Sequence, residues 1–119
     1  MSRRVQATNT TKGTLLGTSI RVADGRWSRL RGLLGAPTLE AGEGLVLIPC
    51  KAVHMYGMKQ SLDVVFVDAD GTVVALYPGL APGQRTKVHR DSRSVFELPP
   101  STIEESGTGL GDTVRTEPA

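Results

Sequence analysis

One short segment gathers most of the side chains that could do chemistry in this sequence. Between positions 50 and 63 it holds a thiol, an imidazole, a phenol, two thioethers, an amine and a carboxylate, carried by Cys50, His54, Tyr56, Met55, Met58, Lys59 and Asp63. Polar and aromatic groups at a junction between a loop and a strand are typical of a binding site. We therefore expect a shallow cleft that binds a small ligand or a protein partner, lined by His54, Tyr56, Met58, Lys59 and Asp63.

Two of these residues allow more than one interpretation. In an extended strand, Lys59 and Asp63 would share one face, because their side chains are separated by an even number of residues. The pair could orient a small polar ligand, or form an ion pair. The Asp63 carboxylate could also cap the backbone of residues 57–61, which is the more common role for an aspartate in such a place.

Cys50 and His54 offer a second function, that of a thiol-dependent enzyme. Such an enzyme needs a thiolate, a base within hydrogen-bonding reach and an oxyanion hole. A spacing of four residues outside a helix does not by itself provide that geometry, so we assign no catalytic residue. An inaccessible Cys50 would exclude this function, because a nucleophilic thiol must be reached by its substrate.

Metal and cofactor sites are not expected. Cys50, His54, Met55 and Met58 are soft ligands of the kind that Cu(I) prefers, but no pair of cysteines supports them. Residues 68–71 resemble the start of a calcium loop, yet the later acidic ligand is missing. The sequence also has no glycine-rich phosphate loop.

The charges are unevenly distributed. Residues 1–35 hold seven of the fourteen basic side chains against Asp24 alone. A basic region of this kind could bind an anionic polymer. However, aromatic residues make up only 4% of the chain, and single-stranded nucleic acid is bound by aromatic platforms. Nucleic acid is therefore not the expected partner.

The chain lacks the features of an exported or membrane-spanning protein. No apolar stretch follows the basic residues at the start, as a secretory signal would require. No window approaches the roughly 20 apolar residues that span a bilayer. A single cysteine also suits a reducing compartment. The expected location is the cytoplasm.

The apolar patterns predict short strands joined by turns. Alternation predicts a strand at 16–22, and the β-branched run at 62–68 predicts the strongest strand. Residues 68–71 would form the hairpin loop that leads to a partner strand. Further strands are expected at 45–48, 72–77, 85–89, 94–98 and 113–114.

Two helical segments are expected. Apolar residues at helical spacing predict one short amphipathic helix near 26–34. Ser101 and Glu104 have the spacing of a capping box, which would begin a helical turn that Gly107 ends. With 119 residues, the chain forms one domain over 1–119, with a core at about 5–115 and a polar tail at 116–119. The fold class is mainly β (α+β), a small β-sandwich or open barrel of six to eight short strands.

Several motifs occur in the order seen in a family of uncharacterised proteins. They are Arg-Gly-Leu at 31–33, Gly-Glu-Gly-Leu at 42–45, Pro-Cys at 49–50, Met-Lys at 58–59, Leu-Asp at 62–63, Glu-Leu-Pro at 97–99 and Gly-Asp at 111–112. Together they resemble the family called domain of unknown function 192, over about residues 5–115. The chain departs from it at Met55 and Tyr56, where threonine and phenylalanine are frequent, and at Ser61, where proline is frequent. Because that family has no established activity, the resemblance implies a compact β-rich fold and no mechanism.

Overall fold

The structure is a computed structural model that describes residues 3–23 and 38–119. The elements in chain order are β1 (Arg4–Asn9), β2 (Thr14–Ala23), β3 (Glu43–Leu47), β4 (Leu62–Val67), β5 (Val73–Leu80), β6 (Ser94–Leu98), α2 (Thr102–Ser106) and β7 (Val114–Pro118). The helix expected near 26–34 lies outside the described residues. Within the described ranges, no helix has the length and apolar character needed to cross a bilayer.

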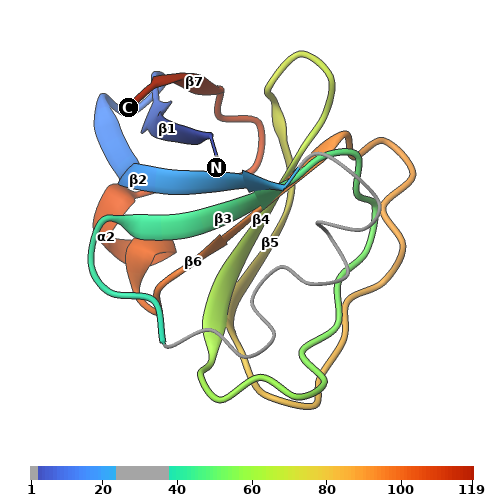
Figure 1. The fold of residues 1–119 in the computed structure, drawn as a ribbon. Coiled ribbons are helices and arrows are strands. Elements are labelled where there is room, and N and C mark those ends of the chain that lie inside the picture. The colour runs from blue at the N-terminus through green and yellow to red at the C-terminus, as the bar shows by residue number, and fades with distance from the viewer. Residues whose placement is uncertain (1–2, 24–37) are drawn as a thin grey trace.

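The seven strands form one sheet that curls into a half-barrel (Figure 1). Their order is β5-β4-β6-β3-β2-β1-β7. Only β2 and β3 pair in parallel, and the other neighbours are antiparallel. The prediction of a mainly β fold is confirmed, and the arrangement is a single curled sheet.

Strand β4 lies inside the sheet, and both of its faces are covered. All six of its residues are buried, which explains the nearly continuous apolar run in the sequence. Val65 and Val67 face the inside of the half-barrel, where they belong to an apolar cluster that we call the inner core. Leu62, Val64 and Phe66 alternate onto the outside, in a second cluster that we call the outer core. Cys50, Val53 and Met55 complete the outer core.

The predicted strands differ from the structure at three places. The strand predicted at 113–114 continues to Pro118 as β7, so that most of the polar tail expected at 116–119 pairs with β1. Residues 85–89 do not form a strand, because their backbone makes irregular hydrogen bonds to the neighbouring loop. The N–H of Thr86 bonds to the carbonyl of Val53 (2.9 Å), and the N–H of His89 bonds to the carbonyl of Lys51 (2.7 Å). Conversely, β1 was not predicted from the sequence. Its inward positions are Val5, Ala7 and Asn9, so its apolar alternation is weak.

The edge strands of the sheet meet near their first residues. Thr72 and Thr113 form an isolated bridge, and the N–H of Val114 bonds to the carbonyl of Gly71 at 2.8 Å. Gly71 has a φ of 86°, and a Cβ placed on it would lie 2.6 Å from the carbonyl oxygen of Val114. Only glycine allows this close approach, and through it the half-barrel closes at this point.

Replacing Gly71 by alanine is therefore expected to destabilise the fold strongly. The matched control is Gly83→Ala, because Gly83 has a φ of 85° but no atom within 4 Å of the added Cβ. Both variants carry the strain of a positive φ, about 1 kcal/mol, and only Gly71→Ala adds the clash with the backbone of β7. Urea unfolding should show a loss at least about 1–2 kcal/mol larger for Gly71→Ala. Equal losses in the two variants would contradict this account of the closure.

A second contact near the closure joins the two ends of the chain. The Oδ2 of Asp112 accepts hydrogen bonds from the side chains of Asn9 (3.0 Å) and Lys12 (2.8 Å) and from the N–H of Gly109 (2.9 Å). The Asn9 amide, then the Lys12 ammonium and the Gly109 N–H lower the pKa of Asp112 to about 2. This carboxylate therefore ties the β1–β2 turn to the turn that precedes β7.

Candidate ligand-binding site

The two ends of the half-barrel differ. Near the start of β4, the helix α2 covers the inner core with Ile103. At the opposite end, a cavity of about 170 Å³ opens between the strands. It is lined by Arg3, Val5, Val22, Val46, Ile48, Val67, Asp68, Ala69, Gly71, Arg93, Ser94, Phe96, Val114 and Thr116, and we call it the mouth pocket. Mouths of β-barrels are common places for ligands.

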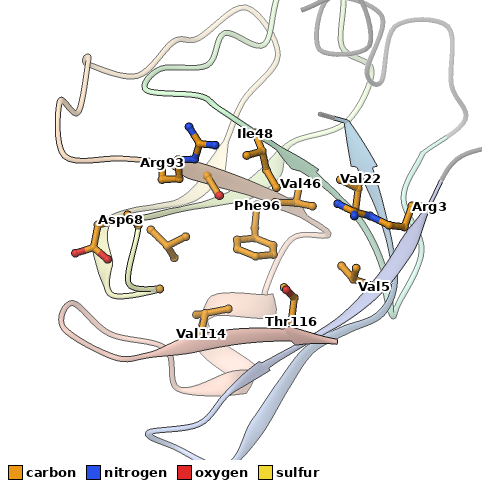
Figure 2. Close-up of a pocket in the computed structure, with 14 residues that line it drawn as sticks. Arg3, Val5, Val22, Val46, Ile48, Asp68, Arg93, Phe96, Val114 and Thr116 are labelled. Atoms are coloured by element: carbon orange, nitrogen blue, oxygen red, sulfur yellow. The ribbon is translucent and has the colours of Figure 1, made fainter. Parts of the chain in front are cut away.

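Apolar side chains form the walls and floor of the mouth pocket. Figure 2 shows the ring of Phe96 in the middle of the view, between Val46 of β3 and Val114 and Thr116 of β7. Phe96 is 2% exposed and packs into the inner core. The alternation of each strand explains this lining, because every second residue of β1, β2, β3, β6 and β7 points into the half-barrel. No single segment of the sequence contributes more than a few of these residues.

Two guanidinium groups and one carboxylate lie among the lining residues. The backbone holds both arginines in place, since the N–H of Val22 bonds to the carbonyl of Arg3 (2.9 Å) and the N–H of Arg93 bonds to the carbonyl of Val67 (2.8 Å). Figure 2 shows the side chain of Arg3 extending from β1 toward Val22. Both arginine residues are exposed.

The carboxylate of Asp68 is engaged in the turn between β4 and β5. Its Oδ1 accepts hydrogen bonds from the N–H groups of Asp70 and Thr72, both at 2.9 Å. In Figure 2 it is turned away from the ring of Phe96. The hairpin predicted at 68–71 is thereby confirmed, with Asp68 as the residue that stabilises its turn.

Four of the five residues predicted as a site from the sequence lie away from the mouth pocket and outside the inner core. His54 and Tyr56 are exposed and their rings stack, with centroids 4.6 Å apart and planes 25° from parallel. Met58 packs against the outer core, and Lys59 is exposed. Lys59 and Asp63 are both described by the structure and form no ion pair with each other. The strand begins only at Leu62, so Lys59 lies outside it and does not share a strand face with Asp63.

The side chain of Asp63 does not point in the same direction as those of these four residues. It is 1% exposed, and the alternation of β4 turns it toward the inside of the half-barrel, with Val65. Its Oδ1 accepts the N–H of Gly79 at 2.9 Å, and its Oδ2 accepts the N–H of Ile103 at 2.8 Å. Asp63 is thus a capping carboxylate, but for α2 and the end of β5, whereas the sequence predicted a cap on residues 57–61.

This contact also corrects the predicted capping box of α2. Ser101 is the N-cap residue of the helix, yet its side chain makes no capping hydrogen bond and its φ is 76°. The N–H of Ile103 is instead satisfied by Asp63, which is distant in the sequence. Gly107 ends the helix at φ 68°, as the sequence predicted.

Cys50 is buried, and its Sγ lies 3.1 Å from the carbonyl oxygen of Ala52, a geometry in which the thiol donates. A buried thiol with a backbone partner is a poor nucleophile. Within residues 3–23 and 38–119, no three histidine, cysteine or acidic side chains gather as a metal site would require.

Two features of the outer core were missed by sequence reasoning. The Oη of Tyr77 lies 2.6 Å from the Nε2 of His89, and the His89 ring packs on Phe66 with centroids 4.6 Å apart. Glu97 is 7% exposed and pairs in register with Leu45 and Val64, both members of the outer core. Burial raises the pKa of Glu97 to about 7. A glutamate within the apolar run of β6 was the available signal for this residue.

Comparison with known proteins places the chain in a family without an assigned activity. Residues 7–116 match the family DUF192 (Uncharacterized ACR, COG1430). A UPF0127 protein from Thermococcus sibiricus is 28% identical over 114 residues, which cover 92% of this chain and 73% of that protein.

Two solved structures share the fold. A protein of unknown function from Novosphingobium aromaticivorans has a TM-score of 0.81 at 21% identity, with 96% of this chain and 84% of that chain covered. A candidate transcription regulator from Sinorhizobium meliloti has a TM-score of 0.78 at 20% identity, with 98% and 94% covered. The half-barrel, the ordered motifs and the match over residues 7–116 lead to one conclusion: the chain belongs to the DUF192 family.

Proposed function

We propose that this protein is a non-enzymatic binding module that holds a small ligand in its mouth pocket. The observation that carries the proposal is a cavity of about 170 Å³ at the end of the half-barrel opposite α2, lined mainly by apolar side chains. An apolar cavity of about 150 Å³ is large enough to hold benzene. The pocket therefore suits a ligand with one apolar group of about that size.

The proposal can be tested by placing a larger side chain at the edge of the pocket. Thr116 lies on the edge strand β7, lines the pocket and is exposed, so a larger side chain can be placed there without disturbing the core. Thr116→Phe should abolish the binding of benzyl alcohol, measured by calorimetry or by NMR. The control is Arg115→Phe, because the preceding residue points to the other face of the strand. Absence of binding to the unmodified protein, or equal binding to both variants, would refute the proposal.

The exposed stack of His54 and Tyr56 supports a second candidate function, contact with a protein partner. Tyr56 is 50% exposed, and tyrosines are enriched in protein interfaces. Neither His54 nor Tyr56 is among the residues that line the mouth pocket. Tyr56→Ala should weaken such a contact at least about tenfold without changing the unfolding midpoint. A partner that binds the variant equally well would remove this candidate.

A further inference from the structure

We infer that the ligand of the mouth pocket is an extended peptide segment, which pairs with the open edge of β7 and places one aromatic or branched apolar side chain in the cavity. This inference rests on the proposed function and names the class of ligand for the same site. It combines the backbone groups at the edge of the sheet with the cavity beside them.

The backbone groups of β7 alternate between its two sides. Its odd-numbered residues bond to β1, since the N–H of Ala119 donates to the carbonyl of Arg4 at 3.2 Å. The N–H of Val114 faces the other way and donates to the carbonyl of Gly71 at 2.8 Å. Because this alternation continues along an antiparallel strand, the N–H and C=O of Thr116 also face away from β1.

The side of Thr116 that faces away from β1 is open. β7 is the last strand of the sheet, so no further strand lies beside it there. Within the part of the chain that the structure describes, no hydrogen bond engages these two backbone groups, and the residue is exposed. An unpaired N–H and C=O at a sheet edge are the groups with which an extended peptide pairs when it adds a strand.

The cavity lies directly beside this edge. The side chain of Thr116 lines the mouth pocket, and Figure 2 shows it between β7 and the ring of Phe96. Opposed residues of antiparallel strands direct their side chains to the same face of the sheet. A ligand residue opposite Thr116 therefore directs its side chain into the pocket. Val46, Phe96 and Val114 offer no hydrogen bonds from their side chains there, so an apolar side chain fits and a polar one loses its hydration.

The closure of the half-barrel sets the direction of the ligand and the place where it ends. Thr72 and Thr113 form an antiparallel bridge on this side of β7, and the ligand continues that arrangement. It therefore runs toward Val114, whose N–H already donates to Gly71. The C-terminal end of the ligand meets the closure, which suits a short segment or the end of a chain.

A second copy of this chain fits the same edge less well. Antiparallel pairing of two β7 strands about Thr116 sets Val114 of each copy opposite Pro118 of the other. Proline has no N–H, and the N–H of Val114 is bonded to Gly71, so only the two Thr116 residues could exchange hydrogen bonds. The short, polar side chain of Thr116 would also leave the apolar cavity unfilled. A separate peptide with an apolar side chain is therefore the favoured occupant.

The experiment uses acetyl-alanyl-phenylalanine methylamide, which carries the benzyl group of benzyl alcohol on an extended backbone. Calorimetry should show that it binds at least about fivefold more tightly than benzyl alcohol, because two backbone hydrogen bonds are added. Methylating the phenylalanine nitrogen removes the donor to the carbonyl of Thr116 and should weaken binding at least about fivefold. The matched control is the dimethylamide, which also gains one methyl group and loses one N–H. That N–H faces away from β7, so its affinity should stay within about twofold.

Hydrogen exchange measured by NMR provides a second readout at the edge itself. In the free protein the amide of Thr116 should exchange rapidly, whereas those of Arg115 and Glu117, which bond to β1, should exchange more slowly. The peptide should slow exchange at Thr116. Benzyl alcohol should leave it rapid, because it fills the cavity without pairing with the strand.

The outcomes separate this inference from the proposed function. If benzyl alcohol binds but the peptide has no advantage, or if the peptide methylated on phenylalanine binds as tightly as the dimethylamide, the peptide is the wrong class and the pocket remains. If the amide of Thr116 exchanges slowly in the free protein and becomes rapid on dilution, a second copy covers the edge and the inference is overturned. If neither benzyl alcohol nor the peptide binds, both the inference and the proposed function are refuted.

Discussion

Asp63→Ala is expected to lower the free energy of unfolding by about 3–5 kcal/mol, a large part of the total stability of a domain of this size. The carboxylate is 1% exposed and each oxygen satisfies one backbone N–H, of Gly79 and of Ile103. Alanine leaves both donors without this partner. A buried donor that loses a charged acceptor costs the fold more than an ordinary hydrogen bond contributes.

Two further variants make this prediction specific. Asp63→Asn keeps one carbonyl oxygen and presents an NH₂ group to the other donor, so we expect about half the loss. Asp70→Ala, at the exposed tip of the hairpin, should stay within about 0.5 kcal/mol of the unmodified protein. Urea unfolding measures all three, and hydrogen exchange should accelerate at the amides of Gly79 and Ile103. An Asp63→Ala variant as stable as the unmodified protein would show that the carboxylate is not a structural cap.

Glu97→Gln is expected to stabilise the protein at pH 8 by about 2–3 kcal/mol and to have little effect at pH 4.5. Burial against Leu45 and Val64 raises the pKa of Glu97 from 4.5 to about 7. The folded state therefore favours the protonated carboxyl. The protonated carboxyl therefore contributes about 3 kcal/mol to the free energy of unfolding below pH 4.5, and this contribution is lost as the pH rises through 7.

The measurement is the free energy of unfolding by urea at several pH values between 4.5 and 8. The unmodified protein should lose stability across this range, whereas Glu97→Gln should give a flatter curve. Glu104→Gln, on the exposed side of α2, is the control and should follow the unmodified protein. Parallel curves for the unmodified protein and Glu97→Gln would contradict the assignment.

A second pH dependence, of opposite sign, is expected in acid. The pKa of Asp112 is lowered to about 2 from 3.8, so its contribution is present above pH 3.8 and is lost as the pH falls through 2. The two groups act in separate windows. The stability of the unmodified protein should therefore be greatest near pH 4–5 as far as these two carboxyl groups determine it.

Local sequence patterns were enough to predict much of the sheet. The run at 62–68 and the turn at 68–71 are encoded by neighbouring residues, because a β-branched run followed by Asp-Ala-Asp-Gly has few other conformations available. β4, the turn and β5 confirm that prediction. β1 was not predicted because its inward residues include the small Ala7 and the polar Asn9. The side-chain amide of Asn9 bonds to Thr108 and Asp112, which are 99 and 103 residues away in the sequence.

The candidate site could not be predicted in the same way. The segment 50–63 is rich in reactive side chains, but alternation in β4 turns Asp63 to the inside while Met58 packs against the outer core. The mouth pocket is built from one or two residues of each of six strands and from neighbouring turn and loop residues. Its strand residues, such as Val22, Val46 and Val114, are not unusual in their own segments. Only the curl of the sheet brings them together with Arg3 and Arg93.

The most direct test of the mouth pocket is a two-dimensional ¹H–¹⁵N NMR titration of the full chain with benzyl alcohol. The largest shifts are predicted at the amides of Val46, Phe96 and Val114, which line the pocket. Shifts concentrated around His54 and Tyr56, or the absence of saturable shifts, would contradict the account.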